Sequence, residues 1–394
     1  MDHAHVLIAG AGPVGLVSAL VLGRAGLRVT VIEAASELSG DLRASTFHPP
    51  TLDMLAVYGL TDSLVRQGLV ARYTQQRDRT EGLVAEFDMQ LLAGDTDFPF
   101  RLQCEQWKLT QLIKAQLDLL PDVSLIFNTE VESVSQSADT VHLQLQTDGQ
   151  RHHMQGDYLI GADGAWSAVR KSMGIEFEGF TYPERFLVVS TAFEFAEHLP
   201  RLSYVNYCSD PLEWCVLLRV PTLWRVLFPT RPNETDADVL DDASVQARLQ
   251  NLLPQSQPYQ TVHRTLYKVH QRVAQSFRKN RVLLAGDAAH INNPLGGMGM
   301  NGGIHDAFNL TEKLTKVWNG APLDTMERYG RQRRKAALES VQAQTLRNRR
   351  IMSETDPDAR KAYHDELRRT VADPEAHRSH LLRSSMILSL RELV

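Results

Sequence analysis

An apolar strand, a glycine-rich turn, a helix and a second strand fill the first 33 residues, and they constrain the fold more than any other feature. The run 5–9 predicts a short strand, and Gly10, Gly12 and Gly15 follow it with the spacing G-x-G-x-x-G. An apolar helix and the strand-like run 27–33 come next. This order predicts a βαβ unit whose glycine turn lies at the carboxyl end of the first strand.

The glycine turn and Glu33 together point to a dinucleotide. Gly10 permits a tight turn, Gly12 lets a pyrophosphate approach the backbone, and Gly15 lets helix and strand pack closely. The start of the helix offers free N–H groups to the phosphates. Glu33 ends the second strand and would accept hydrogen bonds from a ribose diol, so the adenosine should lack a 2′-phosphate. The alternative is a tight turn with a purely structural role.

Two later segments repeat the arrangement of an apolar strand followed by an aspartate. The run 158–162 leads into Asp163 and a glycine, which taken alone fit a solvated turn as well as a site. The run 281–285 leads into Asp287 and then into the glycine-rich loop 294–303. An aspartate there can hold a ribityl or ribose hydroxyl, and a helix that begins at such a loop can stabilise negative charge. This combination predicts a flavin site.

Composition limits the partners and the compartment. Hydrophobic residues make up 43% and charged residues 23% of the 394 residues, as in an ordinary globular protein. The net charge of −5 supplies no basic field for nucleic acid or anionic membranes, and no apolar run reaches the roughly 20 residues of a membrane span. The three cysteines form no C-x-x-C pair, which fits a reducing compartment, and the histidines show no metal-ligand spacing. We expect a cytoplasmic protein without a metal, nucleic-acid or membrane partner.

The remaining chain alternates between strand-rich and helix-rich stretches. Short alternating runs in 123–157 predict a β-meander, and the strand-like stretches of 186–230 predict a different sheet. Residues 235–254 predict one polar helix, and 303–394 predict a helical tail in which the basic stretch 331–335 forms a solvated face. These patterns predict a mixed α/β fold class with a helical C-terminal tail.

The three glycine and aspartate motifs, in this order and at these separations, resemble those of the single-component FAD-dependent aromatic hydroxylases of the para-hydroxybenzoate hydroxylase type. The resemblance covers about residues 4–345. It implies a Rossmann-like FAD-binding domain split in sequence, with a mostly β substrate domain packed against it. It also implies that hydride comes from NADH or NADPH without a second Rossmann unit. The boundaries expected on this basis are 1–71, 101–180 and 276–345 for FAD binding, 72–100 and 181–275 for the substrate domain, and 346–394 for C-terminal helices.

The resemblance also implies which residues hold the cofactor. Arg43 would lie near the pyrophosphate and the pyridine nucleotide, Gln103 near the ribityl or flavin region, and Asp287 on the ribityl chain. Asp163 would mark a motif linked to both FAD and NAD(P)H. The expected cofactor-binding residues are Gly10, Gly12, Pro13, Val14, Gly15, Glu33, Arg43, Gln103, Asp163, Asp287, Gly299, Met300 and Asn301.

Four further residues are expected at the substrate. Tyr204 resembles the tyrosine that receives the phenol proton, Arg219 the arginine that pairs a substrate carboxylate, and Arg225 an arginine near the flavin. Pro294 is expected beside the substrate ring. The alternatives are a satisfied core tyrosine for Tyr204 and a solvated strand edge for the two arginines.

The implied reaction is hydroxylation of a phenolic or heteroaromatic ring, carboxylated or not, by O2 and NAD(P)H through a flavin hydroperoxide. A related flavoenzyme with another oxygenation, a halogenation or an alkene reduction is the first alternative, although the W-x-W-x-I-P segment of flavin halogenases is missing. A non-enzymatic binding protein on the same fold, like the GDP-dissociation inhibitors, is the second. A plain NAD-dependent dehydrogenase would explain only the first motif. A homodimer is the expected assembly.

Overall fold

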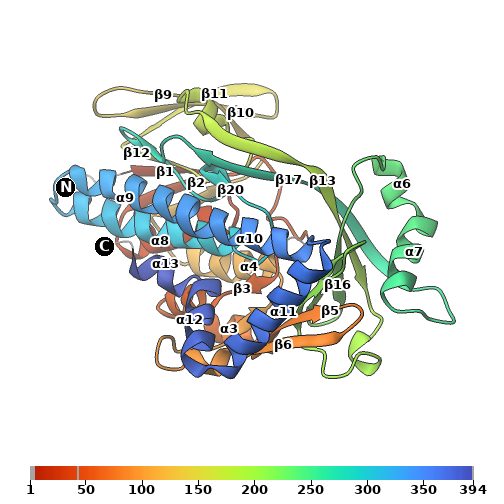
Figure 1. Cartoon of the computed structure of the whole chain (residues 1–394). Coiled ribbons are helices and arrows are strands. Elements are labelled where there is room, and N and C mark those ends of the chain that lie inside the picture. Colours follow the sequence, from red (N-terminus) through yellow and green to blue (C-terminus); the bar gives the residue numbers. More distant parts are fainter. Residues whose placement is uncertain (1–4, 42–43, 393–394) are drawn as a thin grey trace.

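The structure is a computed structural model that describes residues 5–41 and 44–392. A six-stranded sheet forms the nucleotide-binding part of the molecule (Figure 1). Its strands, in spatial order, are β18 (Arg278–Lys279), β19 (Val282–Leu284), β12 (Tyr158–Gly161), β1 (His5–Ala9), β2 (Arg28–Ile32) and β8 (Val123–Ile126). All neighbouring pairs are parallel except β18 with β19. Because these strands come from separate stretches of sequence, the predicted split of the domain is confirmed.

Both faces of this sheet are covered, which explains why its strands read as continuous apolar runs. Helices lie on one face, and the predicted meander lies over the other (Figure 1). The helices are α1 (Pro13–Arg24), α4 (Gln106–Leu117), α8 (Gly299–Trp318) and α9 (Asp324–Lys335). The meander consists of β9 (Thr129–Gln136), β10 (Val141–Thr147) and β11 (Gln150–Gly156), with α5 (Ala168–Ser172) against β9.

An eight-stranded mostly antiparallel sheet forms the second part of the molecule. Its strands, in spatial order, are β20 (His290–Ile291), β17 (Thr261–Ala274), β13 (Phe177–Thr191), β16 (Trp224–Pro229), β15 (Cys215–Arg219), β14 (Val205–Ser209), β5 (Tyr73–Asp78) and β6 (Gly82–Asp88). One face packs against α7, and the other packs against Leu295 and Met352. The two faces therefore have different roles, and only the second faces the nucleotide-binding part.

The polar stretch 235–254 is two helices, not the predicted single one. They are α6 (Asp236–Leu240) and α7 (Asp242–Leu252), and they project from the far side of the large sheet (Figure 1). Asp241 separates them in an extended conformation, and its carboxylate accepts hydrogen bonds from the backbone N–H groups of Ala243 and Ser244. An N-cap of this kind begins a new helix rather than continuing the previous one.

A small sheet and the C-terminal helices are the remaining parts of the fold. The small sheet consists of β3 (Thr46–Phe47), β7 (Arg101–Gln103) and β4 (Leu69–Ala71), beside α2 (Pro49–Ala56) and α3 (Thr61–Gln67). The predicted helical tail is confirmed. A π-helical stretch (Ala336–Gln342) joins α9 to α10 (Ala343–Met352). Three separate helices follow: α11 (Pro357–Ala372), α12 (Pro374–Ser384) and α13 (Ile387–Arg391). Figure 1 shows α11 beside β5 and β6, which it contacts.

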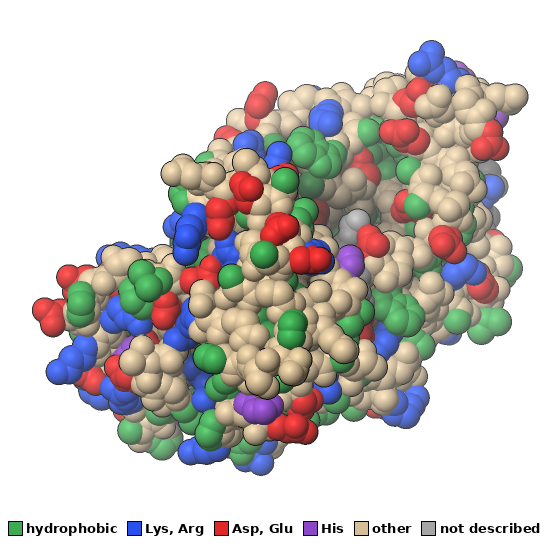
Figure 2. Space-filling view, turned by 90° about the vertical axis from the view of Figure 1, so that its right-hand side faces the viewer, with side chains coloured by type: hydrophobic (Ala, Val, Ile, Leu, Met, Phe, Trp, Pro, Cys, Tyr) green, Lys and Arg blue, Asp and Glu red, His purple; other side chains and the backbone are tan. Residues whose placement is uncertain are grey.

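The surface carries both signs of charge. Figure 2 shows acidic and basic side chains intermixed over the face on the side of α6 and α7, with a hollow near its middle. Within residues 5–41 and 44–392, no helix combines the length and apolar character needed to cross a bilayer.

Candidate active site

The glycine turn has the geometry that its spacing predicts. Gly10 has φ +99°, and a Cβ there would lie 2.4 Å from the carbonyl oxygen of Ala162. A Cβ at Gly15 would lie 2.0 Å from the Gly10 oxygen. A Cβ at Gly12 would meet no atom within 4 Å, so this position faces open space at the start of α1. Gly10 and Gly15 therefore have no room for a side chain. The open space beside Gly12, at the N-terminus of α1, fits a pyrophosphate.

Pro13 and Val14 form the first turn of α1, and their roles are to begin this helix and to pack it against α8. Pro13 stands where a helix lacks a partner for its N–H group, so its missing donor is not a loss. The Val14 side chain packs toward Gly303 of α8, where an added Cβ would lie 2.7 Å from a Val14 methyl group. Val14 therefore fixes α1 against the start of α8, which brings the first and third predicted motifs together.

Two carboxylates lie at the glycine turn. The Glu33 carboxylate accepts hydrogen bonds from the N–H of Ala11 at 2.7 Å and of Ala35 at 2.9 Å, which leaves lone pairs for ribose hydroxyls. Asp163 lies beside Gly10, and one oxygen accepts from the N–H of Val169 at 3.1 Å. Its other oxygen is buried without a hydrogen-bond partner, and burial raises the pKa of this carboxyl. An orphaned buried acceptor fits a site completed by a ligand donor.

Gln103 and Asn301 lie in the interior between β3, β7 and α8. The Gln103 Oε1 accepts from the Thr46 hydroxyl at 3.1 Å, and its buried Nε2 has no partner in the described chain. The Asn301 amide donates to the Thr46 carbonyl at 2.8 Å and accepts from the His48 N–H at 2.9 Å and the Thr51 hydroxyl at 2.7 Å. Gln103 thus keeps a donor for a cofactor, whereas the side chain of Asn301 is occupied in joining β3 and α2 to α8.

Asp287 lies on an exposed turn between β19 and β20, and a buried ion cluster supports that turn. Asp306 is fully buried and accepts from the Gly286 N–H at 3.0 Å, from His290 at 2.7 Å and from Arg333 at 2.5 Å. The expectation of a solvated basic face on α9 is wrong for Arg333, whose side chain is 2% exposed. The sequence shows the charge of Arg333 but not that a carboxylate of α8 faces it.

The remaining cofactor-side residues lie along the glycine-rich loop. Pro294 is exposed, and Gly299 and Met300 are half-buried in the first turn of α8. Leu295 packs against the large sheet, so the loop runs between the two sheets. Arg43 lies outside the described residues.

The two predicted substrate arginines lie on opposite faces of the large sheet. Arg225 is buried on the face toward the nucleotide-binding part, and its guanidinium donates to the Ser45 hydroxyl at 3.3 Å. Burial lowers the pKa of this guanidinium. Arg219 pairs with Glu194 at 3.2 Å and lies over the ring of Trp224, which belongs to the core under α7. The side-chain alternation of β15 turns Arg219 away from the face that carries Arg225, and its contact with a substrate carboxylate stays a prediction.

The predicted substrate tyrosine, Tyr204, is partly exposed to solvent. It precedes β14, its side chain is 38% exposed, and its carbonyl accepts from the backbone N–H of Arg219 at 2.9 Å. Tyr207, three residues later, faces the nucleotide-binding part, and its hydroxyl accepts from Arg101 at 3.2 Å. The role of Tyr204 at the substrate stays a prediction, and Tyr207 is a second candidate because its side chain lies on the face toward the nucleotide-binding part.

A cavity lies where the large sheet, the glycine-rich loop and the C-terminal helices meet. We call it the central cavity; it is partly open to solvent, and its volume is about 50 Å³. Gly296 and Met298 of the loop, Tyr207 of β14 and Arg101 of β7 contribute to its lining, as do side chains from β5, β6, α10, α11 and α12. The C-terminal helices thus form part of a wall that sequence reasoning did not place at the site.

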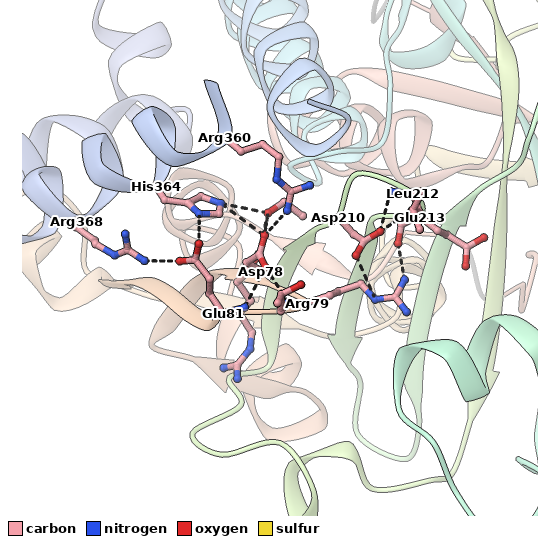
Figure 3. Close-up of polar contacts among 12 residues, drawn as sticks. Asp78, Arg79, Glu81, Asp210, Leu212, Glu213, Arg360, His364 and Arg368 are labelled. Carbon is pink, nitrogen blue, oxygen red and sulfur yellow. Dashed lines mark hydrogen bonds and ion pairs between the residues drawn. The ribbon is translucent and has the colours of Figure 1, made fainter. Parts of the chain in front are cut away.

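Ion pairs fix α11 to the strands of this wall. In Figure 3, Arg360 and His364 of α11 point toward Asp78 at the end of β5, and Arg368 points toward Glu81. The His364 ring lies 3.5 Å from Glu81, and the Arg368 guanidinium lies 2.7 Å from it. The cluster holds the helix over the β5–β6 hairpin and so defines one side of the central cavity.

Comparison with known proteins shows the family. The model of a family described as "FAD binding domain" matches residues 3–344. A para-nitrophenol 4-monooxygenase of Pseudomonas sp. strain WBC-3 is 36% identical over 361 residues, which cover 90% of this chain and 89% of that protein. The chain belongs to the FAD-dependent aromatic hydroxylases. A 6-hydroxy-3-succinoylpyridine 3-monooxygenase of Pseudomonas putida is 34% identical over 90% of both chains.

A solved structure agrees with this membership of the aromatic hydroxylases. The crystal structure of a p-nitrophenol 4-monooxygenase from Pseudomonas putida DLL-E4 superposes with a TM-score of 0.92 at 33% identity, over 100% of this chain and 99% of that one. The predicted flavoprotein hydroxylase with FAD as cofactor is therefore confirmed, and the match favours it over the halogenase, alkene reductase, binding protein and dehydrogenase alternatives.

Proposed function

We propose that this hydroxylase binds its aromatic ring in the central cavity and hydroxylates it there with NAD(P)H and O2. One observation carries the proposal: the cavity is lined on one side by Gly296 and Met298 of the glycine-rich loop and on the other by Tyr207 of the large sheet. A ring in this place would lie between the predicted flavin loop and the substrate sheet. Phe87, Met352 and Leu367 add apolar walls, as an aromatic ligand requires.

FAD supplies the redox and oxygen-activating chemistry when bound, and we propose that the glycine turn and the loop residues hold it. Gly12 offers open backbone at a helix N-terminus, and the orphaned polar atoms of Asp163 and Gln103 offer an acceptor and a donor. The proposed cofactor contacts are Gly10, Gly12, Pro13, Val14, Gly15, Glu33, Arg43, Gln103, Asp163, Asp287, Gly299 and Met300, with the backbone of Asn301 in place of its occupied side chain.

The chain's own groups orient the ring and keep water out. Leu295 packs the loop against the substrate sheet, and α11, which forms ion pairs with the β5–β6 hairpin, lines the cavity. Exclusion of water matters here because water entering the site would divert the activated oxygen to peroxide. Arg225 lies on the correct sheet face to act near the flavin, in agreement with its sequence prediction.

Phenols and hydroxypyridines are the proposed substrate class. The names of the two relatives describe a nitrophenol and a hydroxylated succinoylpyridine, and both compounds are six-membered aromatic rings that carry a hydroxyl group. The experiment is steady-state oxidation of NADH and of NADPH by the FAD-loaded protein with a panel of nitrophenols, hydroxybenzoates, hydroxyphenylpropionates and hydroxypyridines. We expect one class to accelerate oxidation and to yield a hydroxylated product. Equal oxidation with every ring, without product, would contradict the proposal.

We also propose a cytoplasmic homodimer. Support for the compartment comes from Cys104, Cys208 and Cys215, which are buried free thiols, as expected in a reducing environment. Sedimentation of the FAD-loaded protein at micromolar concentration tests the assembly, and a monomer at all concentrations would contradict it. Fractionation of producing cells tests the compartment.

A further inference from the structure

Two cysteines lie opposite each other in the large sheet. Cys208 is the pairing partner of Cys215 in the antiparallel ladder of β14 with β15. Both side chains belong to the core under α7, so they point to the same face of the sheet. Their thiols are free, and a hydrogen bond joins them. The third cysteine of the chain, Cys104, lies in the core of the nucleotide-binding part. The fold therefore brings two of the three thiols together.

The register of this pair allows a disulfide bond. The Arg219 N–H donates to the Tyr204 carbonyl at 2.9 Å, so these residues form a hydrogen-bonded pair. Such pairs recur at every second position of an antiparallel ladder, so Cys208 and Cys215 form one as well. The Cα atoms of such a pair lie about 5.5 Å apart, and disulfides span Cα distances of about 4.4–6.8 Å. The Cβ atoms, about 4.5–5.5 Å apart in a pair, would have to approach to about 3.5–4.5 Å. The bond would therefore be strained and easily reduced.

The turn between the two strands keeps this register. The Asp210 carboxylate accepts hydrogen bonds from the backbone N–H groups of Leu212 and Glu213, each at 2.8 Å (Figure 3). The Arg79 guanidinium donates to the Glu213 carbonyl at 2.7 Å. Because the turn geometry sets the register of a hairpin, these contacts hold the two cysteines opposite each other.

The surroundings of the two sulfur atoms differ and give them different roles. Cys208 is 5% exposed, and Arg77, its partner in the parallel ladder of β14 with β5, interacts with it electrostatically. A guanidinium there stabilises negative charge on the sulfur that attacks an oxidant. Cys215 is fully buried, and its hydrogen bond with Cys208 and its burial raise the pKa of its thiol well above the ordinary value. Cys208 is therefore the first thiol to react, and Cys215 is the second.

We propose that Cys208 and Cys215 form a site that hydrogen peroxide oxidises to a reversible disulfide. The Cys208 sulfur attacks one oxygen of peroxide, the O–O bond breaks, and a sulfenic acid and one water result. The Cys215 sulfur then attacks the Cys208 sulfur, the S–S bond forms, and the S–O bond breaks to release a second water. The two thiols lose two electrons and two protons, and the peroxide takes up both. A hydroxylase supplies this oxidant whenever its activated oxygen is lost as peroxide.

The test treats the FAD-loaded protein with millimolar hydrogen peroxide in the absence of NAD(P)H. Peroxide is then removed, the protein is unfolded, and its free thiols are counted with a chromogenic thiol reagent. The linkage is mapped by mass spectrometry after cleavage at Glu213, which lies between the two cysteines in sequence. We expect two of the three thiols to disappear together. The fragments that carry Cys208 and Cys215 should stay joined until a dithiol reductant separates them.

Matched variants assign the order of the reaction. Cys104→Ser should lose both of its remaining thiols at the wild-type rate, because burial raises the pKa of Cys104 to about 11 and this residue lies outside the pair. Cys215→Ser should stop at a sulfenic acid on Cys208, which a sulfenic-acid trapping reagent labels. Cys208→Ser should keep both of its thiols under the same treatment.

The outcomes separate this inference from the proposed function. Thiols that survive in the native protein, under peroxide that oxidises the urea-unfolded chain, overturn the site. A disulfide that includes Cys104, or sulfinic acid at Cys208 without a linkage, overturns it as well. A second arm supplies NADH or NADPH without a ring compound, with and without catalase, and we expect the linkage only where catalase is absent. The first arm uses neither NAD(P)H nor a ring compound, so failure of the proposed function leaves its result unchanged.

Discussion

At the scale of single residues, local geometry decides which predictions hold. The roles of the glycines were readable because a G-x-G-x-x-G turn depends on neighbours within the same βαβ unit. The substrate roles of Tyr204 and Arg219 stay predictions, because a displacement of one residue along a strand reverses the face of a side chain and no residue type in the sequence marks that register. Arg101 could not be found at all, since its place in the wall of the central cavity depends on contacts with β14 and α12, which are far from it in sequence.

Gly12→Ala should weaken FAD binding without destabilising the fold. An added Cβ meets nothing within 4 Å in the protein, so it would project into the space proposed for the pyrophosphate. We expect a change in unfolding free energy of the apoprotein within about 0.5 kcal/mol and at least about a tenfold rise in the dissociation constant of FAD. Flavin fluorescence titration measures the second quantity.

Gly94→Ala is the matched control for this change, because its Cβ would also meet no atom within 4 Å, on an exposed segment. It should leave both quantities unchanged. Equal FAD affinity of the Gly12→Ala and wild-type proteins would remove the pyrophosphate from this turn.

Tyr204→Phe should leave the steady-state kinetics unchanged. Its hydroxyl lies on a half-exposed side chain outside the central cavity, so its loss removes no contact to the ring. Tyr207→Phe should lower kcat, because the Tyr207 hydroxyl lines the cavity. The comparison of kcat and KM for the two variants with a substrate found in the panel measures the difference. Slow turnover of Tyr204→Phe with normal turnover of Tyr207→Phe would return the site to the residue predicted from sequence.

At the scale of elements, buried charges join helices and strands that are distant in sequence. The Asp306 carboxylate of α8 accepts hydrogen bonds from the Gly286 N–H, from His290 of β20 and from Arg333 of α9. One carboxylate thus holds three segments together around the Asp287 turn. Asp78 of β5 likewise lies within ion-pair distance of both Arg360 and His364 of α11 (Figure 3). Each cluster positions one wall of the proposed site. Its charged residues would be expected at the surface from the sequence alone, but in the fold they join elements in the interior.

Asp306→Asn should destabilise the protein by about 3–5 kcal/mol, because it leaves Arg333 buried without its counter-charge. Burial by itself raises the pKa of Asp306, but His290 and Arg333 outweigh it and lower the pKa below the ordinary value. The stabilisation is thus present above the unfolded carboxyl pKa and disappears as the pH falls through the lower folded one. Urea unfolding at several pH values measures it.

The free energy of unfolding of the wild type should therefore fall to that of Asp306→Asn only in strongly acidic solution. Glu339→Gln is the control, since Glu339 pairs with Lys335 at 3.8 Å on an exposed helix face and should cost under about 1 kcal/mol. A variant at Asp306 as stable as this control would show that the cluster contributes nothing.

Asp78→Asn should loosen α11 and raise KM while the FAD content stays the same. The change removes the charge that Arg360 and His364 face, and α11 then loses its main attachment to β5. Hydrogen exchange of α11, read by mass spectrometry, should accelerate. Asp365→Asn is the control, because its pair with Arg368 is half-exposed and within one helix. Unchanged exchange in α11 would assign its position to apolar packing alone.

At the scale of the whole molecule, the sequence was sufficient for the fold and for the cofactor. Three strand-ending motifs bring separate stretches of sequence into one parallel sheet, and short-range patterns identify each motif. The substrate side could not be predicted in the same way, because the central cavity draws its lining from the large sheet, β7, the loop after β20 and three C-terminal helices. No local pattern marks such a surface, and only the folded chain brings it together.

The most direct test is to run the reaction under isotopically labelled O2. The FAD-loaded protein, NAD(P)H and a ring compound from the panel that accelerates oxidation are incubated, and the product is analysed by mass spectrometry. We predict one labelled oxygen atom in the ring product for each NAD(P)H consumed in coupled turnover. A hydroxylated product whose new oxygen comes from water, or labelled hydrogen peroxide with no ring product for any compound, would contradict the assignment as an aromatic monooxygenase.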